Sequence, residues 1–159
     1  MRRLQPTAID MIRFQADTKL LQRVTRGDQE AMDFLANHWS PYVHEIDDII
    51  DGDRRSAEEI LSTFARAVVL YSHPFYLKNL PSLRQLVLVI NNMYADSVAW
   101  ERSTVDWHRD WADHNRHVGM EMVVAVAQIC GGYDHARAIS MEQRAICYQD
   151  HHDKKGKPV

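Results

Sequence analysis

Apolar residues recur at the three- and four-residue spacing of an α-helix along most of the chain, and short turn signals separate the periodic segments. No segment alternates apolar and polar residues as a half-buried strand does. With 159 residues and 45% hydrophobic content, the chain can close a core without disulfides or a structural metal. We therefore expect an all-α fold, a compact bundle of six or seven helices.

Capping and turn residues divide this pattern. Ser56 followed by Glu59 predicts a capping box, and Gly27 and Gly52 are typical helix stops. The expected helices span 7–24, a short stretch after residue 28, 40–52, 56–71, 82–102, a helix from 104 or 105 to 130, and a last one from 134 or 140 onward, with a loop at 74–81. One helical domain then covers 1–150, and 151–159 forms a flexible polar tail.

The composition argues against several classes of protein. Cys130 and Cys147 lie in apolar helical surroundings without CxxC or Cys/His spacing, which indicates reduced thiols and a cytoplasmic location. No apolar run approaches the roughly 20 residues of a membrane span. A formal charge of −3 gives no general attraction to nucleic acid. We expect neither a membrane nor a nucleic-acid partner, and the oligomeric state stays open.

An acidic helical segment, His44-Glu45-Ile46-Asp47-Asp48-Ile49-Ile50-Asp51, is the strongest functional feature. Asp47 and Asp51 lie one turn apart and border the apolar face of the expected helix. Such a pair repels by a few tenths of a kcal/mol, and no Lys or Arg occupies positions 43–52. A bound cation would explain the pair. A solvated acidic flank and pairing with Arg54 or Arg55 remain the alternative explanations.

A second polar pair, Asn92 and Asp96, lies one turn apart in the segment 82–102, which is apolar almost all round in its first half. We expect this segment to be the central, most buried helix. A carboxylate among Leu88, Val89 and Trp100 must be hydrogen-bonded, ion-paired or metal-bound. A satisfied core pair and a ligand role therefore both remain open.

These segments resemble a known family. Tyr42 to Asp51 resembles the first aspartate-rich motif of squalene and phytoene synthases, and more broadly of class I isoprenoid synthases, while Asn92 to Asp96 resembles the Asn-x-x-x-Asp start of the second motif. Ser97 and Glu101 match a Ser-x-x-x-Glu spacing in terpene synthases. The resemblance implies magnesium ions that grip a substrate diphosphate across an all-helical cavity. The implied metal ligands are Asp47, Asp51, Asn92, Asp96 and Glu101.

Arg116 is the residue we expect to meet a substrate phosphate, because a guanidinium presents a fork of donors to phosphate oxygens. The chain is much shorter than that family's members, so we expect a reduced site: a Mg²⁺-dependent enzyme acting on a diphosphate-bearing small molecule. Two alternatives stay open. One is a non-enzymatic helical interaction protein of the kind that phages or mobile elements encode. The other is an all-α nucleotide pyrophosphatase of the MazG type, which Glu45 and Asp48 resemble by their Glu-x-x-Asp spacing.

Overall fold

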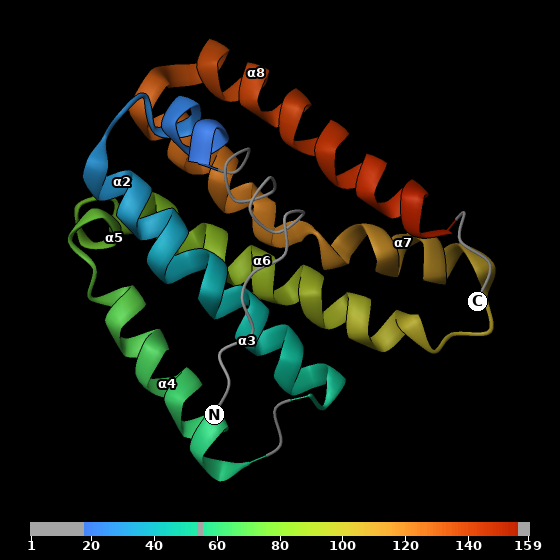
Figure 1. The fold of residues 1–159 in the computed structure, drawn as a ribbon. Coiled ribbons are helices and arrows are strands. Elements are labelled where there is room, and N and C mark those ends of the chain that lie inside the picture. The colour runs from blue at the N-terminus through green and yellow to red at the C-terminus, as the bar shows by residue number, and fades with distance from the viewer. Residues whose placement is uncertain (1–17, 54–55, 156–159) are drawn as a thin grey trace, which may run out of the picture.

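The computed structural model describes the backbone of residues 18–53 and 56–155 and the side chains through residue 145. Every regular element in these ranges is helical, which confirms the all-α bundle (Figure 1). The first expected helix, 7–24, lies mostly outside the described residues, and 18–25 are helical. None of the described helices combines the length and hydropathy needed to cross a membrane.

A single unbroken helical rod follows, made of α2 (Gln29–Asp33), η1 (Phe34–Trp39) and α3 (Ser40–Asp51). Asp28 caps its start by accepting a hydrogen bond from the Ala31 amide, and Gly52 ends it in the left-handed conformation with φ 81°. The expected helix start at Ser40-Pro41 is therefore wrong. Pro41 has no amide to donate, and the wider π turn of η1 comes immediately before it, so the rod continues without a break.

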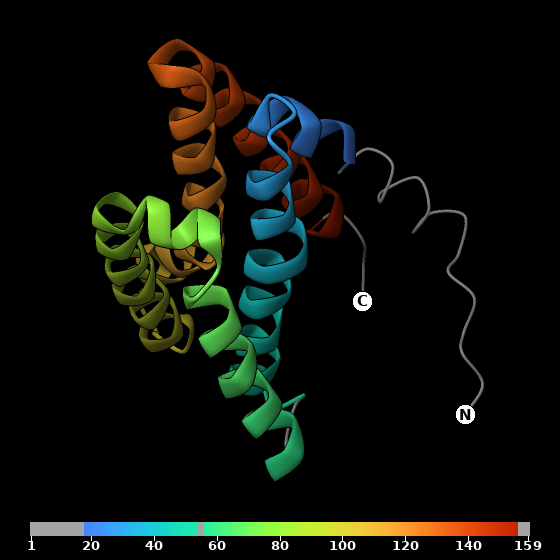
Figure 2. The same ribbon diagram turned by 90° about the vertical axis from the view of Figure 1, so that its left-hand side faces the viewer.

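Helix α4 (Ala57–Tyr71) begins with the expected capping box, in which Ser56 and Glu59 satisfy each other's backbone amides. It packs on the rod around a buried carboxylate. Glu45, 8% exposed, pairs with the Arg66 guanidinium at 2.9 Å and accepts a hydrogen bond from the Thr63 hydroxyl at 3.1 Å. Figures 1 and 2 show α4 at one side of the bundle.

The segment after α4 is more helical than expected. Residues 74–81, expected as a loop, contain the short helix α5 (Pro74–Lys78) and the start of α6 (Leu80–Glu101). Both helices have proline in the first turn, where the missing amide would have had no intrahelical partner. Pro74 and Pro81 therefore lie at helix starts and do not form a loop.

The helix expected from 104 or 105 to 130 is broken. The structure has α7 (Asp106–Arg116), a 3-10 turn η2 (Val118–Met120), and α8 (Glu121–Lys155). Gly132, with φ 78° and ψ −175°, interrupts α8, and the second arm folds back along the bundle (Figure 1). The helical backbone of α8 continues through residues 151–155, which we had assigned to a flexible tail.

The core joins the rod, α4, α5, α6, η2 and α8. Its fully buried large side chains include Phe34, Leu35, Leu70, Leu83, Met122 and Val126. Helix α6 contributes Leu83, Val87 and Ile90, but Leu88 and Val89 are 52% and 51% exposed. The expectation that α6 is covered on several sides is therefore wrong, since it buries one face and leaves another open to solvent.

Leu83→Ala should lower the free energy of unfolding by about 2–5 kcal/mol, because it removes a fully buried side chain and leaves a cavity. Leu88→Ala in the same helix should cost less than about 0.5 kcal/mol, because Leu88 is half-exposed. Urea denaturation of both variants measures the difference. Equal costs would contradict this assignment of the buried face of α6.

Candidate functional site

An apolar cavity of about 410 Å³ lies between α3 and α6. One face of each helix forms its walls, and Trp39 and Gly119 complete the lining. The lining residues are Trp39, Tyr42, Val43, Ile46 and Ile50 from the rod, Ile90, Asn91, Tyr94, Ala95 and Val98 from α6, and Gly119 from η2. This volume falls within the roughly 300–1,000 Å³ range of small-molecule sites.

Gly119 allows η2 to approach the rod closely. A Cβ placed there would lie 3.2 Å from Val43 Cγ1, and the Gly119 carbonyl accepts a hydrogen bond of 3.0 Å from Trp39 Nε1. Both Val43 and Trp39 line the cavity. The close contact therefore sets the position of the rod against η2 on this side of the cavity.

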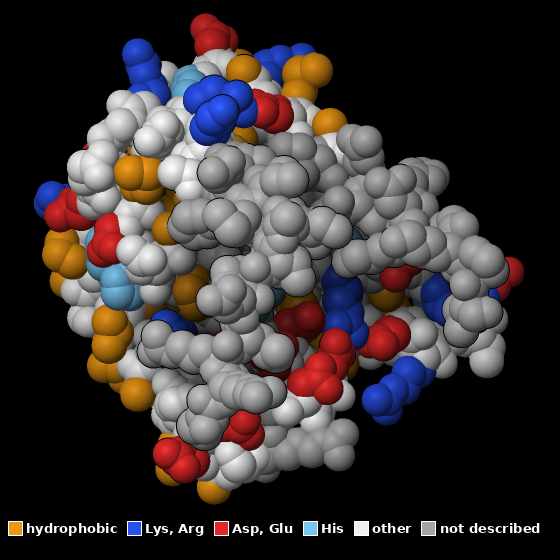
Figure 3. Space-filling model, in the orientation of Figure 1, with side chains coloured by type: hydrophobic (Ala, Val, Ile, Leu, Met, Phe, Trp, Pro, Cys, Tyr) orange, Lys and Arg blue, Asp and Glu red, His pale blue; other side chains and the backbone are white. Residues whose placement is uncertain are grey.

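Beside the cavity, Arg116 joins three carboxylates from two helices. Its Nη1 atom lies 3.0 Å from Asp47 Oδ1 and 3.2 Å from Asp51 Oδ1, and its Nη2 atom lies 2.5 Å from Glu101 Oε2. Figure 3 shows acidic and basic side chains gathered over the end of α3. We call Asp47, Asp51, Glu101 and Arg116 the Arg116 cluster. The structure thus brings together four of the residues predicted from the sequence.

Tyr94 connects the Arg116 cluster to the cavity. Its ring lines the cavity, and its hydroxyl donates a short hydrogen bond to Asp47 Oδ1. The Arg116 guanidinium carbon lies 5.9 Å from the ring centroid, which is cation–π range. Burial raises the pKa of Tyr94, and its hydrogen bond to Asp47 raises it further, so the hydroxyl stays protonated and acts as a donor.

The charges of the Arg116 cluster do not balance. Burial acts to lower the pKa of Arg116, but hydrogen bonds to Glu101 and Asp51 outweigh it and raise the pKa overall, so the guanidinium stays charged. Among the described residues, three carboxylates contact this one cation. Arg54 and Arg55, the alternative partners expected for the acidic segment, lie outside the described residues. The described part of the cluster carries formal excess negative charge at the edge of an apolar cavity, and a further cation would compensate it.

Asn92 and Asp96 do not join this cluster. Both side chains are exposed, and neither lines the cavity, although Asn91 and Ala95 beside them do. At 3.6 residues per turn, they point about 160° away from Tyr94 around the α6 axis. The prediction that Asp96 lies in apolar surroundings is therefore wrong, because this side of α6 faces solvent.

Glu45, of the Glu-x-x-Asp pair behind the pyrophosphatase alternative, is engaged by α4 instead. Glu45 points to α4, where Arg66 and Thr63 bind its carboxylate. It lies among the buried residues between the rod and α4 and is not part of the cavity lining. A shared metal site for Glu45 and Asp48 has no support in this geometry.

The contact of Tyr94 with Asp47 was not predicted from the sequence. The available signal was periodicity, since Tyr94, Val98 and Glu101 follow the i, i+4, i+7 pattern of one helix face. The contact of Arg116 with the acidic segment was likewise not predicted. No family model, curated protein or solved structure was found to match the chain.

Arg116→Gln should lower the free energy of unfolding by about 1–3 kcal/mol, because it leaves three neighbouring carboxylates without their shared cation. The cost should shrink in 1 M NaCl, where the Debye length is only about 3 Å. Arg109→Gln is the matched control in α7, because Arg109 pairs with the exposed Asp106 of the same helix. A control with an equal cost and an equal salt response would rule out a special role for Arg116.

Proposed function

We propose that the chain binds a diphosphate-bearing small molecule together with Mg²⁺, with the apolar part of the molecule in the cavity and the diphosphate at the Arg116 cluster, as the first step of a Mg²⁺-dependent reaction. The observation that carries the proposal is the convergence of Asp47, Asp51, Glu101 and Arg116 beside Tyr94 at the edge of the cavity. The resemblance of the acidic segment to class I isoprenoid synthases supports the same chemistry.

The donor set fits magnesium. Mg²⁺ prefers hard oxygen ligands and is bound through one or two carboxylates, several waters and substrate phosphates. Arg116 contacts one oxygen of each carboxylate, Asp47 Oδ1, Asp51 Oδ1 and Glu101 Oε2, so the second oxygen of each is a candidate ligand. Asp47, Asp51 and Glu101 do not bring one oxygen each within 4.8 Å of one another, so we propose that one or two of them contact the ion directly and that water and phosphate oxygens complete its shell, without Asn92 and Asp96.

Charge makes the two ligands dependent on each other. A diphosphate alone would meet the excess negative charge of the Arg116 cluster and would be repelled. With Mg²⁺ held by the carboxylates, that repulsion would be removed, and the Arg116 guanidinium would donate hydrogen bonds to the phosphate. We expect diphosphate to bind far more tightly with Mg²⁺ than without it.

The protein's own residues have separate roles in this scheme. Tyr94 orients Asp47 through its hydroxyl, and Ile46, Ile50 and Val98 provide apolar contacts for a hydrocarbon group. Arg116 holds the carboxylates together before the ligand arrives and meets negative charge on the phosphate afterwards. The metal supplies stabilisation of the charge that develops on a departing diphosphate.

Mg²⁺ with inorganic pyrophosphate should stabilise the full-length protein by about 2.7 kcal/mol at a hundredfold excess over Kd, measured as a rise in melting temperature. The double variant Asp47→Asn with Asp51→Asn should lose this rise. Asp96→Asn is the matched control, because Asp96 is an exposed carboxylate on the outer side of α6. Asp48→Asn should also matter less than the double variant.

No shift with Mg²⁺ and pyrophosphate in the unmodified protein would overturn the proposal and favour the non-enzymatic interaction protein. That alternative would then have to explain the exposed apolar side of α4, where Leu61, Phe64 and Val68 are 65%, 66% and 70% exposed. A loss as large in Asp96→Asn as in the double variant would equally overturn the placement of the site.

A short prenyl diphosphate should bind more tightly than pyrophosphate in the presence of Mg²⁺. Each methylene that the cavity buries contributes about 0.8 kcal/mol, which is roughly a fourfold gain in affinity. Isothermal titration calorimetry of both ligands measures the ratio. Equal affinities would show that the cavity does not bind the hydrocarbon group. The proposal would then cover only the binding of diphosphate at the Arg116 cluster.

A further inference from the structure

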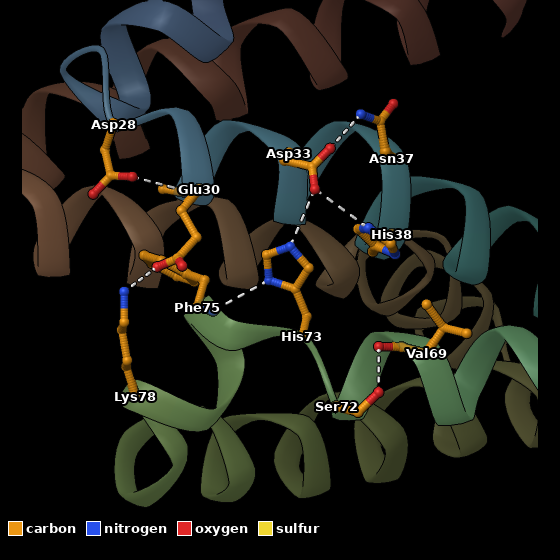
Figure 4. A network of polar contacts seen from close by, with 11 residues as sticks. Asp28, Glu30, Asp33, Asn37, His38, Val69, Ser72, His73, Phe75 and Lys78 are labelled. Carbon is orange, nitrogen blue, oxygen red and sulfur yellow. Dashed lines mark hydrogen bonds and ion pairs between the residues drawn. The ribbon is translucent and has the colours of Figure 1, made fainter.

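A second group of possible metal ligands lies at the other end of the rod. Asp33, His38 and His73 each place one ligand atom within 4.8 Å of the others. Figure 4 shows the Asp33 carboxylate joined by dashed lines to two neighbouring imidazoles, His38 from η1 and His73 from the junction of α4 and α5. This Asp33–His38–His73 group shares no residue with the Arg116 cluster.

The distances match one metal ion. Asp33 Oδ2 lies 3.2 Å from His73 Nε2 and 3.4 Å from His38 Nε2. Ligand atoms about 2.0–2.1 Å from a tetrahedral zinc lie about 3.3 Å from one another. The two distances from Asp33 Oδ2 to the histidine nitrogens therefore agree with the ligand-to-ligand distance around a tetrahedral zinc.

The π turn is what places Asp33 and His38 together. They are five positions apart, and in a regular α-helix residues at this spacing point about 140° apart. The wider turn of η1, in which the Ser40 amide bonds to the Leu35 carbonyl five residues back, brings them onto one side. Single π turns inside α-helices occur frequently at functional sites.

The surroundings favour a ligating carboxylate. Asn37 Nδ2 donates to Asp33 Oδ1 at 2.7 Å, which leaves Oδ2 directed at the imidazoles. This hydrogen bond, followed by that of His73, lowers the pKa of Asp33, so the carboxylate is ionised at neutral pH. A hydrogen bond of this kind orients ligands in established metal sites.

We propose that Asp33, His38 and His73 bind one Zn²⁺ ion, which fastens the rod to the junction of α4 and α5, with water in the fourth position. Zinc fits because imidazole nitrogen with one carboxylate oxygen is a typical zinc donor set, whereas magnesium prefers oxygen alone. Asp33 is 49% exposed at its side chain, so solvent reaches its carboxylate.

His73 must change its tautomer to bind the ion. Its Nδ1 atom accepts the Phe75 amide at 3.2 Å, which places the ring proton on Nε2, facing Asp33. For Nε2 to bind zinc, this proton would move to Nδ1, and the buried Phe75 amide would lose its acceptor. The contact that is lost is a single capping hydrogen bond of a five-residue helix.

Zinc and cobalt titrations of the full-length protein test the site. His151→Asn with His152→Asn serves as the background, so that the adjacent histidines there do not bind the added ion. We expect one Zn²⁺ per chain, a rise in melting temperature, and with Co²⁺ the intense visible bands of a tetrahedral site. His38→Gln and Asp33→Asn should each weaken zinc binding at least tenfold. These two variants leave the His73 cap of α5 in place.

His44→Gln is the matched control, because His44 is an exposed histidine of the same rod that contacts the Ser40 carbonyl. The His44→Gln protein should bind zinc with unchanged affinity. Asp47→Asn with Asp51→Asn should also leave zinc binding intact, which separates this site from the proposed magnesium site. The absence of a one-to-one complex, or equal losses in His38→Gln and His44→Gln, would overturn the zinc proposal and leave the proposed function untouched.

Discussion

The unbroken rod from Gln29 to Asp51 is the constraint on which both proposed sites depend. A helix that is continuous from end to end has a fixed phase, so the π turn at Phe34–Trp39 decides which way all later side chains point. It brings Asp33 and His38 to one side, and it sets the direction in which Ile46, Asp47 and Ile50 face α6. A regular α-helix over the same residues would turn the second half of the rod away from these positions.

The two sites lie at different points along this rod and use different chemistry. Asp33 and Asp47 are fourteen residues apart in sequence, which corresponds to roughly 21 Å of helix. The first site combines imidazole and carboxylate with a histidine from the α4–α5 junction, whereas the second combines carboxylates with a guanidinium from α7. The different donors predict different ions, and their separation makes the two proposals independent.

Buried and half-buried charge recurs where helices meet. Glu45 with Arg66 joins the rod to α4, and Arg116 with Asp47 joins the rod to α7. The first pair is closed, because Thr63 adds a hydrogen bond and the carboxylate is only 8% exposed. The Arg116 cluster is different, because its carboxylates remain about half-exposed and, within the described part of the chain, outnumber the cation. That imbalance beside an apolar cavity is the reason to assign a ligand to the second group and a structural role to the first.

The sequence by itself determined the helical class, the capping of α4, the stop at Gly52 and the placement of Asp47 and Asp51 beside an apolar face. These features depend on hydrogen bonds and side-chain periods that act within a few residues. Only the tertiary structure decided that Arg116 would reach Asp47 across 69 positions, that His73 would meet Asp33 across 40, and that Asn92 and Asp96 would face solvent. The apolar pattern of α6 is compatible with several buried faces, and the packing of its neighbours selects one. The π turn likewise has no distinct periodic signal, because one widened turn shifts the phase of a helix without changing its residue types.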